Sequence, residues 1–433
     1  MAKRYAVVGV GSRSTMYTKA LANDYRQHAV LVGLCDNNSA RLELARRSLP
    51  ADHPEVPLFS DADFGAMLRQ TKPDALIVVS KDVTHSGYII AGLEAGLEVI
   101  TEKPLTTDEH QCVKILETLG RCKGSSLRVT FNYRYSPPRS QIRRMLQMDR
   151  CIGDITSLDF NWWLDTRHGA DYFRRWHRNR VNSGSLLVHK ATHHFDLVNW
   201  WIGSHPVEVF AQGRRAYYTP QTADEVLGLS GRSDRCHTCK VHDKCPFFLD
   251  LAANENLKTM YLDCEHADGY LRDRCIFSDQ IDIWDTMSLS VRYASGALMS
   301  YSLNAYLPIE GYSIAFNGNR GRLEHKACEN TYVSGDGSVP GELARSNVST
   351  TLIPAFEKPR SVEIEHSAGG HGGGDALLLD DIFLPEQSAD PLGRRASQLD
   401  GAYSILVGIA AYRSIDAGRP IRVDELVRPE LLA

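Results

Sequence analysis

The sequence lacks the marks of several protein classes. No apolar run reaches 18 residues, so we expect no transmembrane helix. No long basic run occurs and the net charge is −4, which argues against nucleic acid or an anionic membrane as the main partner. There is no internal repeat or low-complexity segment. The first residues, MAKRYAVVGVGS, lack the apolar stretch and small-residue cleavage site of a signal peptide, which favours the cytoplasm.

The composition is that of a globular protein with more than one domain. The chain has 433 residues, of which 43% are hydrophobic and 24% charged. This length exceeds that of one ordinary core and predicts two domains or three. In a cytoplasmic chain, the ten cysteines are expected to be mostly reduced or metal-bound rather than joined in disulfides.

The first part of the chain alternates β-rich runs with helical stretches. Strands are expected at residues 4–10, 30–35, 75–80, 99–101 and 127–132, with helices between them. This alternation predicts an α/β fold with a doubly wound parallel sheet. Such sheets bind ligands beyond the carboxyl ends of their strands. The polar residues at or just after those ends are Ser80, His85, Glu102, Lys103 and Asn132.

The turn after the first strand has the glycine spacing of a dinucleotide site. Residues 9–14 read GVGSRS, so Ser14 replaces the third glycine of G-x-G-x-x-G. The two glycines permit a tight turn and a close approach of the backbone to a pyrophosphate at a helix N-terminus. The candidate cofactor contacts in this turn are Gly9, Gly11, Ser12 and Arg13.

Asp36 stands at the end of the second expected strand. An acidic residue at this place can accept hydrogen bonds from the ribose hydroxyls of NAD and repel the 2′-phosphate of NADP. The alternative for Asp36 is an ordinary helix N-cap or turn residue. Its position relative to the glycines favours the ribose role, and therefore NAD over NADP.

Five motifs together resemble the glucose–fructose oxidoreductase/inositol dehydrogenase/MocA (Gfo/Idh/MocA) family. They are the G-x-G-x-R turn, Ser80 with His85, Glu102-Lys103-Pro104, Asn132-Tyr133-Arg134-Tyr135 and Ile142-Arg143. The resemblance covers nearly the whole chain. It implies an NAD-binding Rossmann domain (1–125) and an α+β domain (126–433) with an open, mostly antiparallel sheet. It also implies a closing helix at 398–417 and a dimer or tetramer.

Lys103 is the residue of the E-K-P tripeptide that the resemblance places in the active site. In that family, this lysine contacts both the nicotinamide region and the substrate hydroxyl. A cation there could stabilise a developing alkoxide and assist removal of the hydroxyl proton. The alternative, a surface charge, fits poorly with a position beside Pro104 at a strand end.

The stretch SGSLLVHKATHHFDLVNWW, residues 183–201, predicts one helix from Leu186 to Ile202, ended by Gly203. At helical spacing one face carries His189, His193, Asp196 and Trp200, and the opposite face is apolar. The two imidazoles at i and i+4 could bind a metal. Equally, they could be acid/base and substrate-binding groups that face a cleft. The third possibility is a buried, hydrogen-bonded helix without chemistry.

This helix resembles the family segment G-G-x-L-x-D-x-G-x-H-x-x-D. His193 takes the position of the family's histidine, which implies that it exchanges the substrate hydroxyl proton. Asp196 takes the position of the last aspartate. His189 replaces the family's first aspartate and Ala191 its glycine. His189 therefore indicates a different substrate, or a metal bound between the two histidines.

Further substrate contacts are expected from the second half of the chain. Its strands are predicted at residues 155–164, 207–212, 286–293, 297–305, 312–317 and 321–325. In the family such a sheet closes over the nicotinamide, and polar and aromatic residues line the cleft. The candidates are Tyr133, Trp163, Asp165, His168, Trp176 and His177, with plain packing as the alternative.

Two further segments carry candidate sites. The glycine-rich run at 369–375 includes His371 and resembles the G-H-G-G segment of NAD-dependent glycoside hydrolases of the α-N-acetylgalactosaminidase type.

A charged insert at about 231–280 carries C-x2-C spacing with two more distant thiols. This spacing suits structural zinc, an iron–sulfur cluster being a weaker fit and free thiols the alternative. The expected ligands are Cys236, Cys239, Cys245 and Cys275, in preference to Cys264.

The sequence therefore predicts an NAD-dependent sugar or cyclitol dehydrogenase. Hydride passes to the nicotinamide, His193 takes the hydroxyl proton and Lys103 stabilises the alkoxide. Two alternatives stay open. The first is a glycoside hydrolase or lyase that oxidises its sugar transiently with bound NAD, and the second is a non-catalytic protein that binds sugar and NAD.

Overall fold

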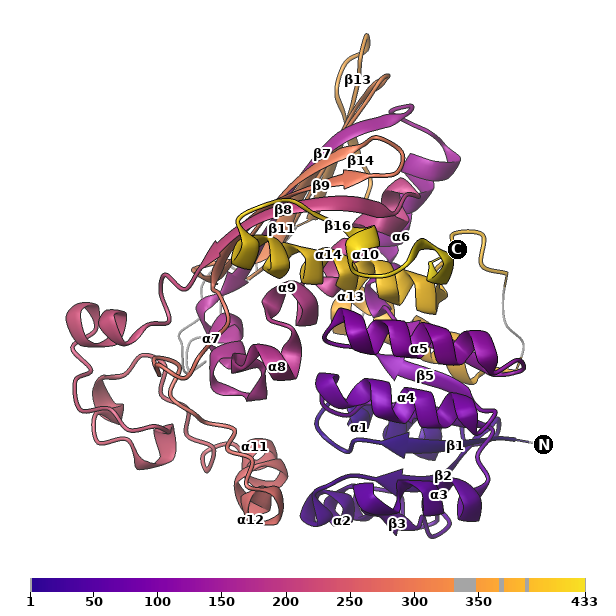
Figure 1. The fold of residues 1–433 in the computed structure, drawn as a ribbon, viewed down its shortest axis with the longest axis vertical. Coiled ribbons are helices and arrows are strands. Elements are labelled where there is room, and N and C mark those ends of the chain that lie inside the picture. Colours follow the sequence, from indigo (N-terminus) through magenta and orange to yellow (C-terminus); the bar gives the residue numbers. More distant parts are fainter. Residues whose placement is uncertain (1, 331–347, 366–369, 386–388, 433) are drawn as a thin grey trace.

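The computed structural model describes residues 2–330, 348–365, 370–385 and 389–432. Two sheets make up the molecule, with a layer of helices between them (Figure 1). Within the described residues, no helix is long and apolar enough to cross a membrane.

The first sheet has seven strands in the order β15-β6-β5-β4-β1-β2-β3 and is parallel except for β15. The central strands read as continuous apolar runs because helices cover both faces of a parallel sheet. The sequence predicted this Rossmann sheet correctly. The last parallel strand, β6, extends the sheet past the boundary expected at residue 125. The bounds are β1 Lys3–Val8, β2 Ala29–Cys35, β3 Leu58–Phe59, β4 Ala75–Val78, β5 Glu98–Glu102, β6 Ser126–Thr130 and β15 Ala396–Ser397.

Some of the helices that follow these strands begin at side-chain caps. Asn38 and Asp108 each accept a hydrogen bond from a first-turn amide of the next helix. The long C-terminal helix begins with a capping box between Ser397 and Asp400. The bounds are α1 Ser14–Lys19, α2 Ser39–Arg47, α3 Phe64–Thr71, α4 His85–Glu94, α5 Glu109–Arg121, α6 Pro137–Arg143, α13 Gly370–Phe383 and α14 Gln398–Ala417.

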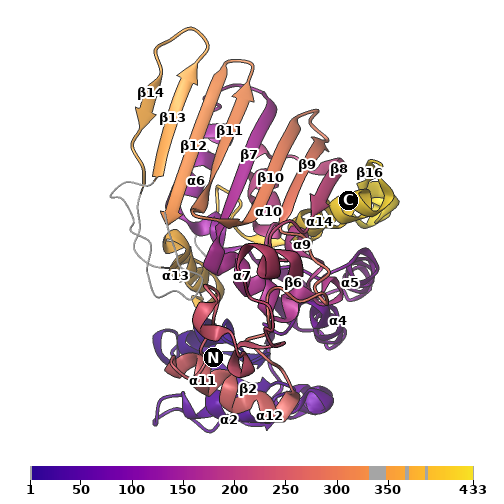
Figure 2. The same cartoon turned by 90° about the vertical axis from the view of Figure 1, so that its left-hand side faces the viewer.

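The second sheet has nine strands in the order β14-β13-β12-β11-β7-β10-β9-β8-β16, and only β7 and β10 pair in parallel. Along β9 buried and exposed residues alternate, so one face packs on the helices and the other faces outward (Figure 2). This is the open, mostly antiparallel sheet that was predicted. The bounds are β7 Ile155–Asp165, β8 Pro206–Arg214, β9 Thr286–Tyr293, β10 Leu298–Leu307, β11 Glu310–Gly318, β12 Gly321–Asn330, β13 Val348–Pro354, β14 Arg360–Val362 and β16 Ile421–Arg422.

The prediction of a single helix over residues 186–202 is wrong. The chain instead forms α9, Leu186–His189, and α10, Thr192–Ile202, with a break between them. The amide of Ala191 donates to the carbonyl of Leu186 at 2.8 Å, which closes a wider turn than that of an α-helix. In α10, moreover, every residue except Asn199 is buried, so the helix has no open polar face.

The helices α7, Thr166–Arg174, and α8, Arg180–Ser183, lie beside α9 below the second sheet (Figure 1). The insert that follows β8 has only short helical segments, among them α11, Glu255–Met260, and α12, Glu265–Asp268. It reaches down to α2 of the first domain, where Nδ2 of Asn38 donates to the carbonyl of Cys264 at 2.9 Å. Figures 1 and 2 both show α12 next to α2.

Candidate active site

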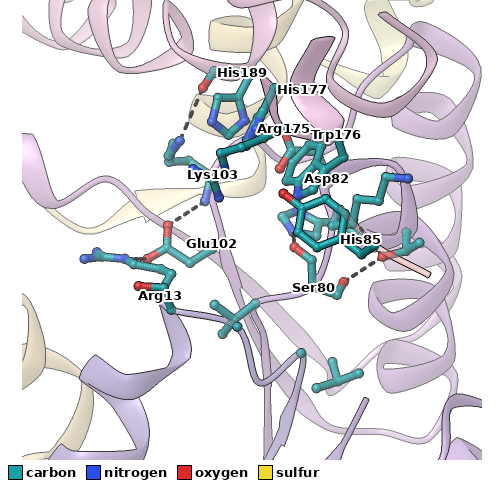
Figure 3. Close-up of a pocket in the computed structure, with 18 of the residues that line it drawn as sticks. Arg13, Ser80, Asp82, His85, Glu102, Lys103, Arg175, Trp176, His177 and His189 are labelled. Atoms are coloured by element: carbon teal, nitrogen blue, oxygen red, sulfur yellow. Dashed lines mark hydrogen bonds and ion pairs between the residues drawn. The ribbon is translucent and has the colours of Figure 1, made fainter. Parts of the chain in front are cut away.

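A cavity of about 780 Å³ lies where the two domains meet, at the carboxyl ends of the parallel strands. This volume is in the range of small-molecule and cofactor sites. Figure 3 shows its strand-end residues and the residues of the second domain that face them. The predicted site residues along this cavity are Gly9, Gly11, Ser12, Arg13, Asp36, Ser80, His85, Glu102, Lys103, Asn132, Tyr133, His168, His177, His189 and His193.

The glycine turn is shaped by the neighbouring strand end. Gly9 has φ +89°, and a Cβ there would lie 2.6 Å from the backbone of Ser80, so no side chain fits. A Cβ on Gly11, by contrast, would meet no atom within 4 Å, because Gly11 faces the open cavity. Such a bare, open backbone is suited to a closely approaching dinucleotide.

Asp36 is buried beside this turn. Its Oδ2 accepts the Val10 amide at 2.7 Å, and its Oδ1 accepts the Asn38 amide at 2.8 Å. Burial raises the pKa of Asp36 above its ordinary value, although both amides and Arg41 favour the charged form. Nη2 of Arg41 lies 3.7 Å from Oδ1 of Asp36. The carboxylate is therefore held rigidly at the end of β2.

Glu102 links the glycine turn to the E-K-P segment. Its Oε1 accepts from Nε of Arg13 at 2.6 Å and from the Tyr17 hydroxyl at 2.9 Å. Burial alone would raise the pKa of Glu102, but Arg13, Lys103 and these hydrogen bonds hold it below its ordinary value. Glu102 is therefore ionised, and its charge stabilises the cations of Arg13 and Lys103, which line the cavity.

Lys103 is a half-buried lysine on the cavity wall (Figure 3). Its Nζ donates to the carbonyl of His189 at 3.3 Å. Burial lowers the pKa of Lys103 to about 8, and the carboxylates of Asp82 and Glu102 limit the fall. A lysine with this pKa can exchange its proton near neutral pH.

His85 braces the two strand ends next to Lys103. Its Nδ1 lies 2.8 Å from the carbonyl oxygen of Pro104, and its Nε2 lies 3.1 Å from that of Ser80. Burial lowers the pKa of His85. Both ring nitrogens are occupied by the backbone, so His85 fixes the shape of the wall.

Asp82 was not predicted from the sequence, and it makes the closest contact of His189. Its Oδ2 is hydrogen-bonded to Nδ1 of His189, and its side chain is only 4% exposed. Burial and the charge of Lys103 lower the pKa of His189 well below its ordinary value, so the ring is neutral. With Nδ1 held by a carboxylate, a neutral imidazole can use Nε2 toward a ligand.

The rings of the second domain pack around His189. His177 lies edge-on to it with ring centres 4.1 Å apart, and Trp176 stacks on His177 at 3.6 Å. Both line the cavity. Among the described residues, Nδ1 of His177 and Oδ1 of Asn132 are buried without a hydrogen-bond partner. Both residues line the cavity, one from each domain.

His193 lies on a different wall from His189, because the helix breaks between them. Its ring stacks on Tyr133 with centres 4.1 Å apart and an interplanar angle of 13°. The neighbouring His194 does not reach the cavity: it stacks on Trp162 and its Nδ1 lies 2.7 Å from the Tyr301 hydroxyl.

His168 also lines the cavity, and its ring lies between Glu310 and Tyr172, which the sequence did not single out. Its Nδ1 is 2.9 Å from Oε1 of Glu310, and its Nε2 is 3.0 Å from the Tyr172 hydroxyl. Asp165 does not line the cavity but caps α7, accepting the amides of Arg167 and His168 at 2.8 Å. Asp165 therefore positions His168.

Two more predicted residues lie away from the cavity. Asp196 is fully buried in an ion pair with Arg134, whose Nε donates to its Oδ2 at 2.9 Å, and burial raises its pKa to about 7 against the influence of Arg134. Trp163 does not line the cavity. Successive side chains of a strand point to opposite faces, so Trp163 lies on the face opposite the buried Trp162. His371 falls in the first turn of α13, and its side chain lies outside the described residues.

The four predicted thiols gather in the insert. Cys236, Cys239, Cys245 and Cys275 line one small cavity there, whereas Cys264 is not among its lining residues. All are free thiols, and burial raises the pKa of Cys236, Cys245 and Cys275. Within the described part of the chain, no group of three or more histidine, cysteine, aspartate or glutamate side chains has an arrangement able to hold a metal. The i, i+4 pair His189 and His193 forms no such group either.

Both halves of the chain match one family. Residues 3–131 match the model described as an oxidoreductase family with an NAD-binding Rossmann fold, and residues 147–423 match the family's C-terminal alpha/beta domain. The chain belongs to the Gfo/Idh/MocA oxidoreductase family. The resemblance seen in the sequence is confirmed.

The names of similar proteins in the Gfo/Idh/MocA family differ in whether they state a substrate. YteT of Bacillus subtilis (strain 168), which carries the name of an oxidoreductase without a substrate, is 39% identical over 98% of both chains. Inositol 2-dehydrogenase of Paracoccus denitrificans (strain Pd 1222) is 31% identical over 32% of this chain and 39% of its own.

Solved structures of similar fold extend over the whole chain. The WlbA dehydrogenase of Bordetella pertussis, in complex with NADH and UDP-GlcNAcA, has a TM-score of 0.64 and 18% identity, covering 98% of this chain and 99% of its own. The aldose–aldose oxidoreductase of Caulobacter crescentus has a TM-score of 0.61 and 14% identity, covering 98% of this chain and 100% of its own. At these identities the likeness shows the fold.

Proposed function

We propose that this chain transfers a hydride between NAD and a hydroxyl-bearing carbon of a sugar or cyclitol. The observation that carries the proposal is Lys103, a half-buried lysine with a pKa lowered to about 8. It lines one cavity together with His189, Asp82 and the glycine turn. The relatives named inositol 2-dehydrogenase and the WlbA structure with a nucleotide sugar support polyol substrates.

The residues of the first domain fit a dinucleotide. Gly9, Gly11, Ser12 and Arg13 would hold its pyrophosphate side, and Asp36 would accept hydrogen bonds from the adenosine ribose. Ser80, His85, Glu102 and Asn132 shape the wall at the nicotinamide end. When bound, NAD supplies the hydride acceptor. Its preference over NADP rests on Asp36.

The substrate hydroxyl would meet the cation of Lys103. An ammonium at this place stabilises the alkoxide that develops as the hydroxyl loses its proton. We assign the acceptance of that proton to His193, whose ring is fixed on the cavity wall by Tyr133. His189, oriented by Asp82, would hold a second hydroxyl of the substrate through Nε2. His168 and His177 offer further hydrogen-bonding atoms to a polyol.

A panel of cyclitols, aldoses and nucleotide-linked sugar acids tests the proposal. The purified protein should reduce NAD with at least one member, and His193→Asn should lower kcat by about 100-fold or more while NADH binding is kept. Cleavage of aryl glycosides without net NADH would instead favour the hydrolase or lyase alternative. Binding of sugar and NAD with neither reaction would favour the non-catalytic alternative.

Two further proposals concern assembly and metal content. The outward face of the second sheet would form the contact of a dimer or tetramer, which light scattering on the purified protein tests. Structural zinc on Cys236, Cys239, Cys245 and Cys275 is proposed from their spacing and common cavity. It would require the thiols to rearrange, because no group of the described side chains is arranged to hold a metal. Elemental analysis that finds about one zinc per chain would support it. Absence of metal in protein purified without chelator would leave four ordinary thiols.

A further inference from the structure

The insert forms one wall of the coenzyme end of the cavity. Asp268 and Tyr261 of the insert line the same cavity as Asp36 and Arg41 of the first domain. The contact is fixed by Asn38, which is fully buried and donates through Nδ2 to the carbonyl of Cys264. The ribose end of the proposed coenzyme site is therefore built from both domains.

Arg41 lies between two carboxylates at this wall. Its Nη2 is ion-paired with Oδ2 of Asp268 and lies 3.7 Å from Oδ1 of Asp36. The side chains of Arg41, Asp36 and Asp268 are 10%, 9% and 7% exposed, so water screens the pairs weakly. With all three ionised, the group carries one net negative charge.

Asp268 is held in place by the second domain. Within the insert, Arg235 pairs with Glu265 at 2.6 Å and with Asp273 at 2.7 Å. Arg272 then pairs with Asp171 of α7 at 2.7 Å. These contacts fix the segment that carries Asp268, so its carboxylate is preorganised against Arg41.

We propose that Asp268, acting through Arg41, makes the site reject the 2′-phosphate of NADP. This inference rests on the proposed function, in which Asp36 binds the adenosine ribose. An arginine beside that ribose is the group that usually accepts a 2′-phosphate. Here Asp268 occupies the guanidinium and adds a second negative charge. Asp36 alone would leave Arg41 free to turn toward the phosphate.

Binding measurements on Asp268→Asn test the inference without turnover. Titration of the full-length protein with NADPH and NADH should show NADPH affinity raised by about tenfold or more, because Arg41 is released, and NADH affinity nearly unchanged. The double variant Arg41→Ala/Asp268→Asn should lose the gain. Asp268→Glu keeps the charge and should keep the original ratio of NADPH to NADH affinity.

The matched control is Asp263→Asn, in the same insert. Asp263 is 47% exposed and pairs with Lys258, away from the cavity, so neither affinity should change. An unchanged ratio of NADPH to NADH affinity in a folded Asp268→Asn protein overturns the inference and leaves the proposed function standing. A starting protein that binds neither coenzyme overturns both.

Discussion

At the scale of single residues, Lys103 has the central role in the proposed chemistry of the cavity. Its side chain lines the cavity, and the nearby Asp82 and Glu102 limit the fall of its pKa. Glu102 is in turn held ionised by Arg13. The cation is therefore kept while its pKa is brought close to neutral pH, which suits a group that stabilises a transient alkoxide.

Replacing Lys103 by methionine removes the cation and keeps most of the side-chain volume. We expect kcat to fall by about 100-fold or more, with NADH affinity altered by no more than a few-fold. Steady-state kinetics and an NADH titration separate the two effects. A Lys103→Met protein that retains most of its kcat would show that the ammonium has no catalytic role.

The pH dependence follows from the pKa of Lys103. Because burial lowers it to about 8, the cation is lost as pH rises through that value, and kcat/KM for oxidation should decline above about pH 8. Lys103→Arg keeps its charge at higher pH and should lose this decline, even if its rate is lower. A decline at the same pH in Lys103→Arg would assign it to another group.

Residue roles were predictable where a local pattern defines them. The glycine turn, Asp36 and the strand-end residues line one cavity because the carboxyl ends of parallel strands meet at one edge, while their roles stay predictions. Asp82 was missed because its partner, His189, is distant in the sequence; its place just after β4 was the available signal. Strand alternation could have placed Trp163 away from the cavity.

At the scale of elements, the break between α9 and α10 sets the two histidines on different walls. Gly408 of α14 packs against the backbone of Leu187 in α9, where a Cβ would overlap the Leu187 carbonyl. Strands with clear periodicity were predicted closely, as β9 shows. The break between α9 and α10 was not predicted, because no proline or glycine marks it. The contact that Gly408 makes with α9 also comes from a helix far along the chain.

Gly408→Ala should destabilise the protein through this contact. The added methyl must push α14 away from α9, and we expect a loss of about 1–3 kcal/mol in the free energy of unfolding. Gly120→Ala in α5 is the matched control, because a Cβ there meets no atom within 4 Å. It should be neutral or stabilising by about 0.5–1 kcal/mol. Equal melting temperatures for the two variants would contradict the packing account.

At the scale of the whole molecule, the cavity exists only because two domains and an insert meet. The first domain supplies the dinucleotide turn, Lys103 and His85, the second supplies the other histidines, and the insert supplies Asp268. The alternation of strands and helices predicted the first sheet, and the family resemblance implied the open second sheet. The sequence could not predict how the insert docks, because Asn38–Cys264 and Arg41–Asp268 join segments far apart in the chain.

The most direct measurement follows the hydride itself. The protein is incubated with NAD and with perdeuterated cyclitols and aldoses, and the NADH formed is analysed by nuclear magnetic resonance. We predict deuterium at C4 of the nicotinamide with the original protein, and none above background with Lys103→Met. NADH binding without any transfer of deuterium from the whole panel would contradict the proposed dehydrogenase.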